Sequence, residues 1–113
     1  MHEYSVVQAL LNQCEEQAIK NDATQVIKVI AKIGVMSGIE PHLLQVAFDT
    51  FKEGTICNEA EFIINTQKLK LECKECKYVF EVDEVRYFCT QCESLRVKVL
   101  DGEDMYLMSL EMK

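Results

Sequence analysis

Four of the six cysteines in this chain of 113 residues form two pairs of the type Cys-x-x-Cys. Cys73 and Cys76 make the first pair, and twelve residues later Cys89 and Cys92 make the second. Two residues between cysteines allow one tight turn to direct both sulfurs at a single ion, and the second pair completes a tetrahedron at Zn–S distances of about 2.3 Å. The spacing therefore predicts a closed Zn(II) site of four thiolates, which is structural rather than catalytic.

Two other chemistries use the same residues. A redox Cys-x-x-Cys is usually a single motif at the start of a helix, whereas both pairs here lie among residues typical of strands. An iron–sulfur cluster also takes four thiolates. Zinc is favoured by ligand type, and the redox pair and the cluster remain the alternatives. Four lysines near the first pair would offset the negative charge of the thiolates, although solubility explains them equally well: Lys68, Lys70, Lys74 and Lys77.

The remaining two cysteines do not share this spacing. Cys14 falls on the apolar side of an expected helix, and Cys57 falls in an expected loop. Free cysteines in such places usually behave as inert, small hydrophobic residues. We therefore expect neither of them to be a metal ligand.

One of the two histidines is the second residue of the chain. The free amine of Met1, the amide nitrogen of His2 and its imidazole can close two fused chelate rings around one ion. The backbone or side chain of Glu3, or a group from another element, would supply a fourth ligand. A planar, nitrogen-rich site suits Ni(II) or Cu(II), although a lone histidine is more often an ordinary surface residue. His2 is thus the main candidate nickel ligand, with the Met1 amine and Glu3 as weaker candidates.

Two further groups could act as outer ligands of the same ion. Glu40 and His42 lie at the expected start of a second helix. An acid at a helix start and a solvent-facing histidine are the more ordinary explanations. Because a metal must displace protons from the imidazole (pKa about 6.5) and the amine (pKa about 7.7–8.0), binding at His2 should weaken below neutral pH.

Two segments carry apolar side chains at helical spacing. Residues 3–20 repeat them at intervals of three and four, with Cys14 on the apolar face. A second such segment starts at Pro41, whose fixed φ suits a first helical turn, and closes at Gly54. Both helices are therefore expected to bury one face and to leave the other in water.

Strand patterns separate the two helices and follow the second. Residues 26–36, 60–66 and 104–112 alternate between apolar and polar side chains, as half-buried strands do. Shorter strand-like runs occur at 78–80 and 96–99, within the cysteine-rich segment. In the first strand, one face is expected to carry Ile27, Val29, Ala31, Ile33 and Val35.

This order of elements predicts an α+β fold class. It consists of two helices packed on a small mixed β-sheet, with a zinc-ribbon-like four-cysteine module inserted before the last strand. Residues 1–68 plus 101–113 are expected to form a nickel-binding α/β domain, and residues 69–100 a zinc-binding domain. The linkers are not rich in Gly or Pro, so we expect the module to be hinged rather than freely tethered.

Charge and composition exclude several classes of protein. The formal net charge of −7 argues against nucleic-acid binding, because proteins that bind nucleic acids present a basic patch. The N-terminus lacks the positive region of a secretion signal, and no stretch approaches the roughly 18 apolar residues of a membrane span. Six cysteines without such a signal indicate metal or redox chemistry rather than a disulfide framework, and we expect the protein in the cytoplasm. No hydrolase triad, phosphate-binding Gly loop or HExxH motif is evident, so the chain is not expected to be an enzyme.

The combination of motifs resembles the HypA/HybF family, the nickel-incorporation proteins of [NiFe]-hydrogenase maturation. The resemblance is carried by MHEYSVVQALL at the N-terminus, by CxxC-x12-CxxC, and by a last strand ending in MSLEM. It covers essentially the whole chain. It implies a metallochaperone that carries Ni(II) at His2 and holds structural Zn(II) at the four cysteines: Cys73, Cys76, Cys89 and Cys92.

The resemblance also implies partners. They are a HypB-like maturation GTPase and the [NiFe]-hydrogenase large-subunit precursor, and in some bacteria the urease accessory proteins as well. No nucleic-acid or membrane partner is expected, and the chain should be a monomer or a weak homodimer. Some members carry histidines beside the CxxC pairs, whereas Tyr78 and Glu93 stand at comparable places here. A pH-sensing role for zinc-side histidines is therefore not expected.

The residues alone leave one competing function. In that alternative the chain is a zinc-ribbon module that binds proteins or nucleic acid, and His2 has no metal role. The acidic net charge argues against it, as does the position of the cysteines late in a chain that has its own α/β frame. The residues also do not separate nickel from copper, since Cu(II) binds nitrogen ligands more tightly.

Overall fold

The computed structural model describes residues 2–82 and 87–113, and for His2 the backbone alone. The chain divides into two compact units, which we call the helical unit and the cysteine unit. The helical unit comprises Met1–Lys32, Ile39–Asn65 and Tyr106–Lys113, and the cysteine unit comprises Ile33–Gly38 and Thr66–Met105. The cysteine unit thus contains three stretches that the sequence pattern assigns to the nickel-binding domain: residues 33–38, 66–68 and 101–105.

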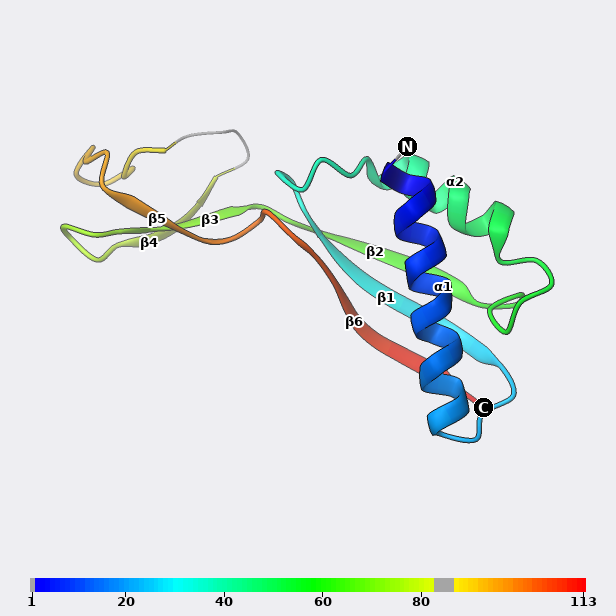
Figure 1. The fold of residues 1–113 in the computed structure, drawn as a ribbon. Helices are drawn as coiled ribbons and strands as arrows, with labels where there is room; N and C mark the ends of the chain where they lie inside the picture. Colours follow the sequence, from blue (N-terminus) through cyan, green and yellow to red (C-terminus); the bar gives the residue numbers. More distant parts are fainter. Residues whose placement is uncertain (1, 83–86) are drawn as a thin grey trace. The chain divides into compact units, whose positions relative to one another are not determined.

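Two helices and a three-stranded sheet make up the helical unit (Figure 1). The helices are α1 (His2–Lys20) and α2 (Pro41–Phe51). The strand order is β2–β1–β6, so the last strand of the chain pairs with the first. The strands are β1 (Val26–Gly34), β2 (Glu61–Gln67) and β6 (Met105–Met112), and each has one or two end residues in the cysteine unit.

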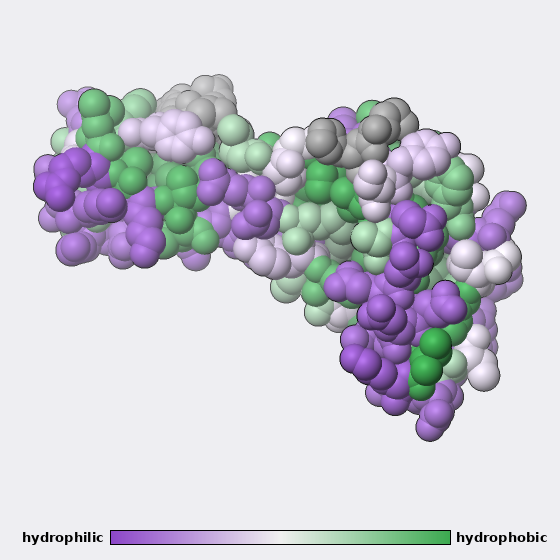
Figure 2. All heavy atoms as spheres, viewed as in Figure 1, coloured by the Kyte–Doolittle hydropathy of each residue, from purple (hydrophilic) through white to green (hydrophobic). Residues whose placement is uncertain are grey.

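Helix α1 buries the apolar face that its spacing predicts. Its inward side chains are shielded from water, whereas hydrophilic side chains cover much of its outer surface (Figure 2). Helix α2 packs on the sheet through Phe48, whose ring stacks on Phe62 of β2 with 4.4 Å between centroids. The buried residues of α1 are Glu3, Val7, Leu10, Leu11, Cys14 and Ala18.

Strand β1 departs from the strict alternation that the sequence suggests. Val29, Ala31 and Ile33 are buried on one face, but Ile27 and Val35 are exposed, and the prediction for these two residues is wrong. The buried positions Val26 and Val29 are three apart, so the alternation slips by one residue near the start of the strand. Helix α2 also ends earlier than predicted, at Phe51 rather than near Gly54. The α+β class itself is confirmed.

A second three-stranded sheet forms the cysteine unit, with β3 at its centre in the order β4–β3–β5. Both pairings are antiparallel, and Leu71 of β3 lies opposite Phe80 on one side and Val99 on the other. Strand β3 is not among the strands predicted from the sequence. The strands are β3 (Leu69–Cys73), β4 (Val79–Val82) and β5 (Val97–Asp101), and the buried core is Leu69, Leu71, Cys73, Phe80, Val82 and Cys89.

Two glycines allow three stretches of backbone to meet within the cysteine unit. Gly102 has a φ of 108°, and a Cβ there would lie 2.7 Å from the Cα of Leu69. A Cβ on Gly34 would overlap the carbonyl group of Gly102. Hydrogen bonds join the same stretches: the amide of Val35 donates to Gln67 (2.9 Å) and the amide of Met36 donates to Gly102 (2.8 Å). Glycine is required here because no side chain fits between the backbones.

Among the described residues, no helix is long and apolar enough to cross a membrane.

Candidate metal centre

Each cysteine pair sits on a turn of the same construction. In the first turn, the Cys73 amide donates to the carbonyl of Tyr78 (2.9 Å) and the Lys77 amide donates to the carbonyl of Cys73 (3.0 Å). Lys77, directly after the second cysteine, adopts a left-handed conformation with φ of 67°. Strand β3 ends at Cys73 and β4 starts at Val79, so this turn connects two strands of one sheet.

The second turn repeats this pattern of hydrogen bonds. The Cys89 amide donates to Ser94 (2.8 Å), the Glu93 amide donates to Cys89 (2.9 Å), and Glu93 is left-handed with φ of 62°. Each turn also directs the amide of its second cysteine at the sulfur of its first, at 3.4 Å in both cases. The two Cys-x-x-Cys motifs are therefore two copies of one local structure, each presenting a pair of sulfurs.

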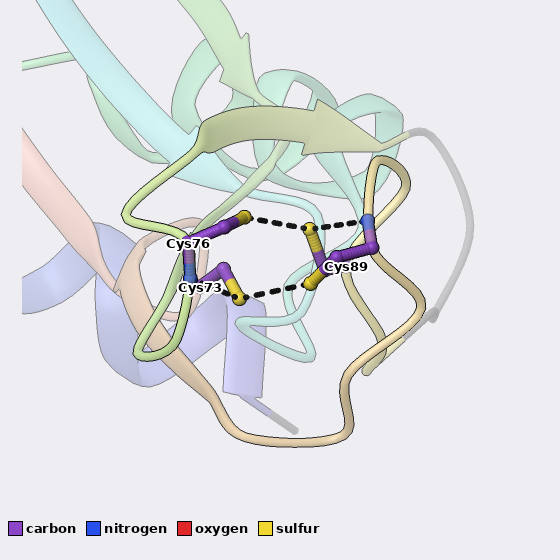
Figure 3. Close-up of side chains that lie close together, drawn as sticks. Cys73, Cys76 and Cys89 are labelled. Atoms are coloured by element: carbon purple, nitrogen blue, oxygen red, sulfur yellow. Dashed lines mark hydrogen bonds between the residues drawn. The ribbon is translucent and has the colours of Figure 1, made fainter.

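The two turns bring all four sulfurs together. The four Sγ atoms lie within 4.8 Å of one another, and Cys73–Cys92 and Cys76–Cys89 are both 3.6 Å apart. Figure 3 shows the sulfurs of Cys73, Cys76 and Cys89 converging from the two turns. A tetrahedral zinc ion with bonds of about 2.3 Å requires sulfurs about 3.8 Å apart. The cluster therefore fits a metal ion of this size and coordination.

Burial divides the four cysteines into two kinds. Cys73 and Cys89, the first residue of each pair, are fully buried and belong to the core of the cysteine unit. Cys76 and Cys92 are exposed. A metal bound by all four would therefore tie the surface of each turn to the core beneath it.

The pKa values of the four thiols follow the same division. The backbone amide of Cys76, with help from that of Glu75, lowers the pKa of Cys73 to about 6. Burial opposes ionisation of Cys89, but the amides of Cys92 and Gln91 outweigh it and lower its pKa. Backbone amide donors thus stabilise the thiolate form of the first cysteine in each pair.

The second cysteine of each pair has a raised pKa. An amide hydrogen bond from Ser94 favours ionisation of Cys92, but the nearby Cys73 sulfur and burial raise its pKa to about 12. Cys76 likewise has a hydrogen bond from the Tyr78 amide, and burial with the Cys73 and Cys89 sulfurs raises its pKa. Cys76 and Cys92 therefore keep their protons at neutral pH until a cation replaces them.

The structure describes part of the predicted nickel site. Met1 and the side chain of His2 lie outside the described residues. Glu3 is buried at 8% exposure, and its Oε2 accepts a hydrogen bond from the amide of Glu40 at 3.3 Å. The Glu40 carboxylate in turn accepts from the Leu43 amide at 2.7 Å and so caps α2. The start of α1 therefore lies against the start of α2.

Some of these features are not apparent from the sequence pattern. The spacing predicts the four sulfurs but not the amides that point at Cys73 and Cys89, nor the left-handed conformations of Lys77 and Glu93. Neither is a glycine or an asparagine, so the usual composition signal is missing. The contact between Glu3 and Glu40 joins residues 37 positions apart. His42 is exposed in the first turn of α2.

A family model described as hydrogenase/urease nickel incorporation, metallochaperone, hypA matches residues 1–112. The chain belongs to the HypA family. It is 51% identical over 113 residues to the hydrogenase maturation factor HypA of Shewanella baltica (strain OS223), covering 100% of this chain and 97% of the relative. It is 48% identical to the factor of the same name from Aquifex aeolicus (strain VF5), with coverage of 100% and 98%.

A solved structure supports the same relationship. The solution structure of the Ni metallochaperone HypA from Helicobacter pylori superposes with a TM-score of 0.70 at 40% identity, covering 97% of this chain and 96% of that one. The resemblance to HypA inferred from the motifs is thereby confirmed. HypA proteins are metallochaperones and maturation factors, so the prediction of a metal-handling protein that is not an enzyme is also confirmed.

Proposed function

We propose that this chain binds Ni(II) at its N-terminus and delivers it during maturation of [NiFe]-hydrogenase. The observation that carries the proposal is the packing of the first turn of α1 against α2, through the hydrogen bond from the Glu40 amide to Glu3. This contact fixes the backbone next to His2, in a chain that matches a family of nickel-incorporation metallochaperones over residues 1–112. A fixed backbone reduces the entropy that chelation at the N-terminus would otherwise cost.

The start of a helix is a suitable place for amide ligands. Helix α1 begins at His2, and the first amides of a helix have no intrahelical acceptor. Replacing the proton of such an amide by a metal therefore breaks no helical hydrogen bond. The positive end of the helix dipole disfavours a bare cation, but the negative charge of a deprotonated amide counters it.

Two carboxylates near this helix start add to the negative charge. Glu3 accepts a hydrogen bond from the Glu40 amide across the contact between α1 and α2, and the Glu40 carboxylate accepts one from the Leu43 amide within α2. We propose the Met1 amine, the His2 amide and the His2 imidazole as the primary nickel ligands, with a group of Glu3 as the fourth. Glu40 remains a candidate outer ligand.

For the second metal, we propose that Cys73, Cys76, Cys89 and Cys92 hold Zn(II). The donor set of four sulfurs at tetrahedral spacing supports this assignment. When bound, zinc would supply a cross-link between the two turns and no open coordination position for catalysis. The small core of six residues explains why a cross-link is needed, since a unit of this size buries little apolar surface.

The proposed partners are a HypB-like maturation GTPase and the [NiFe]-hydrogenase large-subunit precursor. The names of the relatives, hydrogenase maturation factors, support the second of these. Delivery to urease is proposed on the description of the family alone. We place this activity in the cytoplasm, because thiolate ligands require a reducing compartment.

Equilibrium nickel binding to the untagged protein, with zinc content measured in parallel, tests the proposal. His2→Ala should abolish tight nickel binding and leave one zinc per chain. His42→Ala is the matched control, because it removes the other histidine, which is exposed on α2. Equal nickel affinity for wild type and His2→Ala would refute the N-terminal site. If His42→Ala loses nickel binding and His2→Ala keeps it, the nickel site lies on α2 instead.

A further inference from the structure

A pocket between α1 and α2 is lined mainly by apolar side chains. Helix α2 lies beside the N-terminal part of α1 (Figure 1), and the pocket between them has a volume of about 180 Å³. The Tyr4 ring packs edge to face on Phe51, with 4.5 Å between centroids, and forms part of the wall. A cavity of about 150 Å³ holds a benzene ring, so this pocket has room for one leucine or aromatic side chain. Further lining residues are Leu43, Val46 and Thr50.

The apolar residues at this pocket are exposed to water. Tyr4, Leu43 and Val46 each have about half of their surface exposed, whereas Leu44 and Phe48 of the same helix α2 are fully buried. Helix α2 therefore has two apolar faces, one of which packs on the helical unit while the other faces solvent. A contiguous apolar patch of this kind on a protein surface marks an interaction site.

The polar groups that belong to the lining already have partners within the fold. The Thr50 hydroxyl donates to the carbonyl of Val46 at 2.8 Å. The carboxylate of Glu3, which also lines the pocket, accepts from the amide of Glu40 at 3.3 Å. The pocket therefore binds through shape and apolar contact more than through hydrogen bonds.

The helices that form the pocket are acidic. Helix α1 has no lysine or arginine before Lys20 at its end, and α2 has none. Lys52, directly after α2, already contacts Asp49 at 3.7 Å and the carbonyl of Ala60 at 3.0 Å. The helical unit as a whole has ten acidic residues against five lysines. The acidic residues of the two helices and the α2 cap are Glu3, Glu15, Glu16, Glu40 and Asp49.

We propose that this pocket docks an amphipathic helix of the protein with which the chain exchanges nickel. One large apolar side chain of that helix, a leucine or an aromatic residue, enters the pocket between α1 and α2. Lysine or arginine residues beside it face the acidic helices. A helix fits because a groove between two helices receives the apolar stripe of a third, and its basic residues complement the charge of the groove.

The choice of partner rests on the proposed nickel function. Glu3 lines the pocket and directly follows His2, so a partner docked there lies next to the proposed nickel ligands. Charge argues against a second copy of this chain as the occupant. A second copy would bring the same acidic helices to the pocket, and like charges at an interface oppose association.

The proposal is tested by calorimetric titration of the untagged, zinc-loaded chain against the HypB-like maturation GTPase and, separately, against the hydrogenase large-subunit precursor. Val46→Arg fills the pocket and adds a positive charge, and it should weaken binding to the partner that uses the pocket by about tenfold or more. Ile19→Arg is the matched control. It makes the same change at an exposed apolar residue of α1 outside the pocket lining, and it should stay within about twofold of wild type.

A second variant keeps the test free of added charge. Leu43→Ser shortens an exposed residue of the lining and should also weaken binding, while circular dichroism shows whether each variant keeps its helices. Wild type that binds neither partner, or equal affinities of wild type, Val46→Arg and Leu43→Ser, would overturn the proposal. Higher ionic strength should weaken wild-type binding, and an affinity independent of salt would contradict the basic helix.

Two measurements separate this proposal from its alternatives. Leu43→Ser should bind nickel as tightly as wild type, whereas His2→Ala should lose nickel and still dock to the partner when nickel is absent. The docking surface and the nickel site can thus fail independently. Sedimentation of the chain alone tests the second copy: if wild type is a dimer and Val46→Arg a monomer, the pocket binds another copy of the chain and the proposal is wrong.

Discussion

The approach of the backbones at Gly102 can be tested with three glycine-to-alanine substitutions. In the cysteine unit, Gly38 has a φ of 80° and open space around it, whereas Gly34 has no positive φ but would clash with Gly102. Gly102 combines the two problems, with a φ of 108° and a Cβ position 2.7 Å from the Cα of Leu69. The three substitutions therefore measure the backbone conformation alone, the steric overlap alone, and both together.

The expected magnitudes follow from these differences. Gly38→Ala should cost about 1 kcal/mol, the lower end of the penalty for a left-handed alanine. Gly34→Ala should cost about 1–3 kcal/mol, as overpacking does, because the clashing atoms belong to backbone. Gly102→Ala should cost about 3–5 kcal/mol, since conformational strain of about 1–3 kcal/mol adds to the overlap.

Amide hydrogen exchange of β3 and β5 in the zinc-loaded proteins provides the assay, because it reports the local stability of the cysteine unit. The protection of these amides should fall in the order Gly38→Ala, Gly34→Ala, Gly102→Ala, with the α1 amides little changed. If Gly102→Ala loses no more protection than Gly38→Ala, the close approach of the three backbone stretches is wrong.

Three further predictions concern the metal centre and α2. Cys92→Ser should lose zinc and unfold the cysteine unit while α1 retains its helical circular dichroism; unchanged zinc stoichiometry would refute the assignment of this ligand. Zinc binding at pH 7 should release between two and three protons, because Cys73 is already ionised with a pKa of about 6, whereas Cys76 and Cys92 are protonated. The number of protons released should rise as pH falls through 6, since Cys73 then also carries a proton. Calorimetry in buffers of different ionisation enthalpy measures this number. A release of four protons at pH 7 would contradict these pKa values. Glu40→Ala should cost about 1 kcal/mol of unfolding free energy through loss of the α2 cap, and Glu40→Gln less, as measured by urea unfolding; equal losses would mean that the carbonyl oxygen does not replace the carboxylate as a cap.

Local patterns in the sequence predict much of this fold. The helical spacing of Val7, Leu10 and Cys14 predicts α1, and Pro41 predicts the start of α2, because both signals act within a few residues. Strand β3 is not predicted although Leu69, Leu71 and Cys73 alternate, because it has no β-branched or aromatic residue, unlike the runs at 78–80 and 96–99.

Local patterns do not predict contacts between residues that are far apart in the sequence. The slip in β1 that exposes Ile27 depends on where the strand is packed, not on its own sequence. The convergence of the four sulfurs is predictable, because a Cys-x-x-Cys turn has few ways to present its ligands. The contact of Glu3 with Glu40 is not, because only the tertiary fold brings these two residues together.

The two metal environments can be compared directly by X-ray absorption at the nickel and zinc edges of untagged protein loaded with one ion of each. We predict nitrogen and oxygen neighbours around nickel, with the multiple-scattering signature of an imidazole, and four sulfurs at about 2.3 Å around zinc. A sulfur shell around nickel would contradict an N-terminal cargo site separate from the four cysteines.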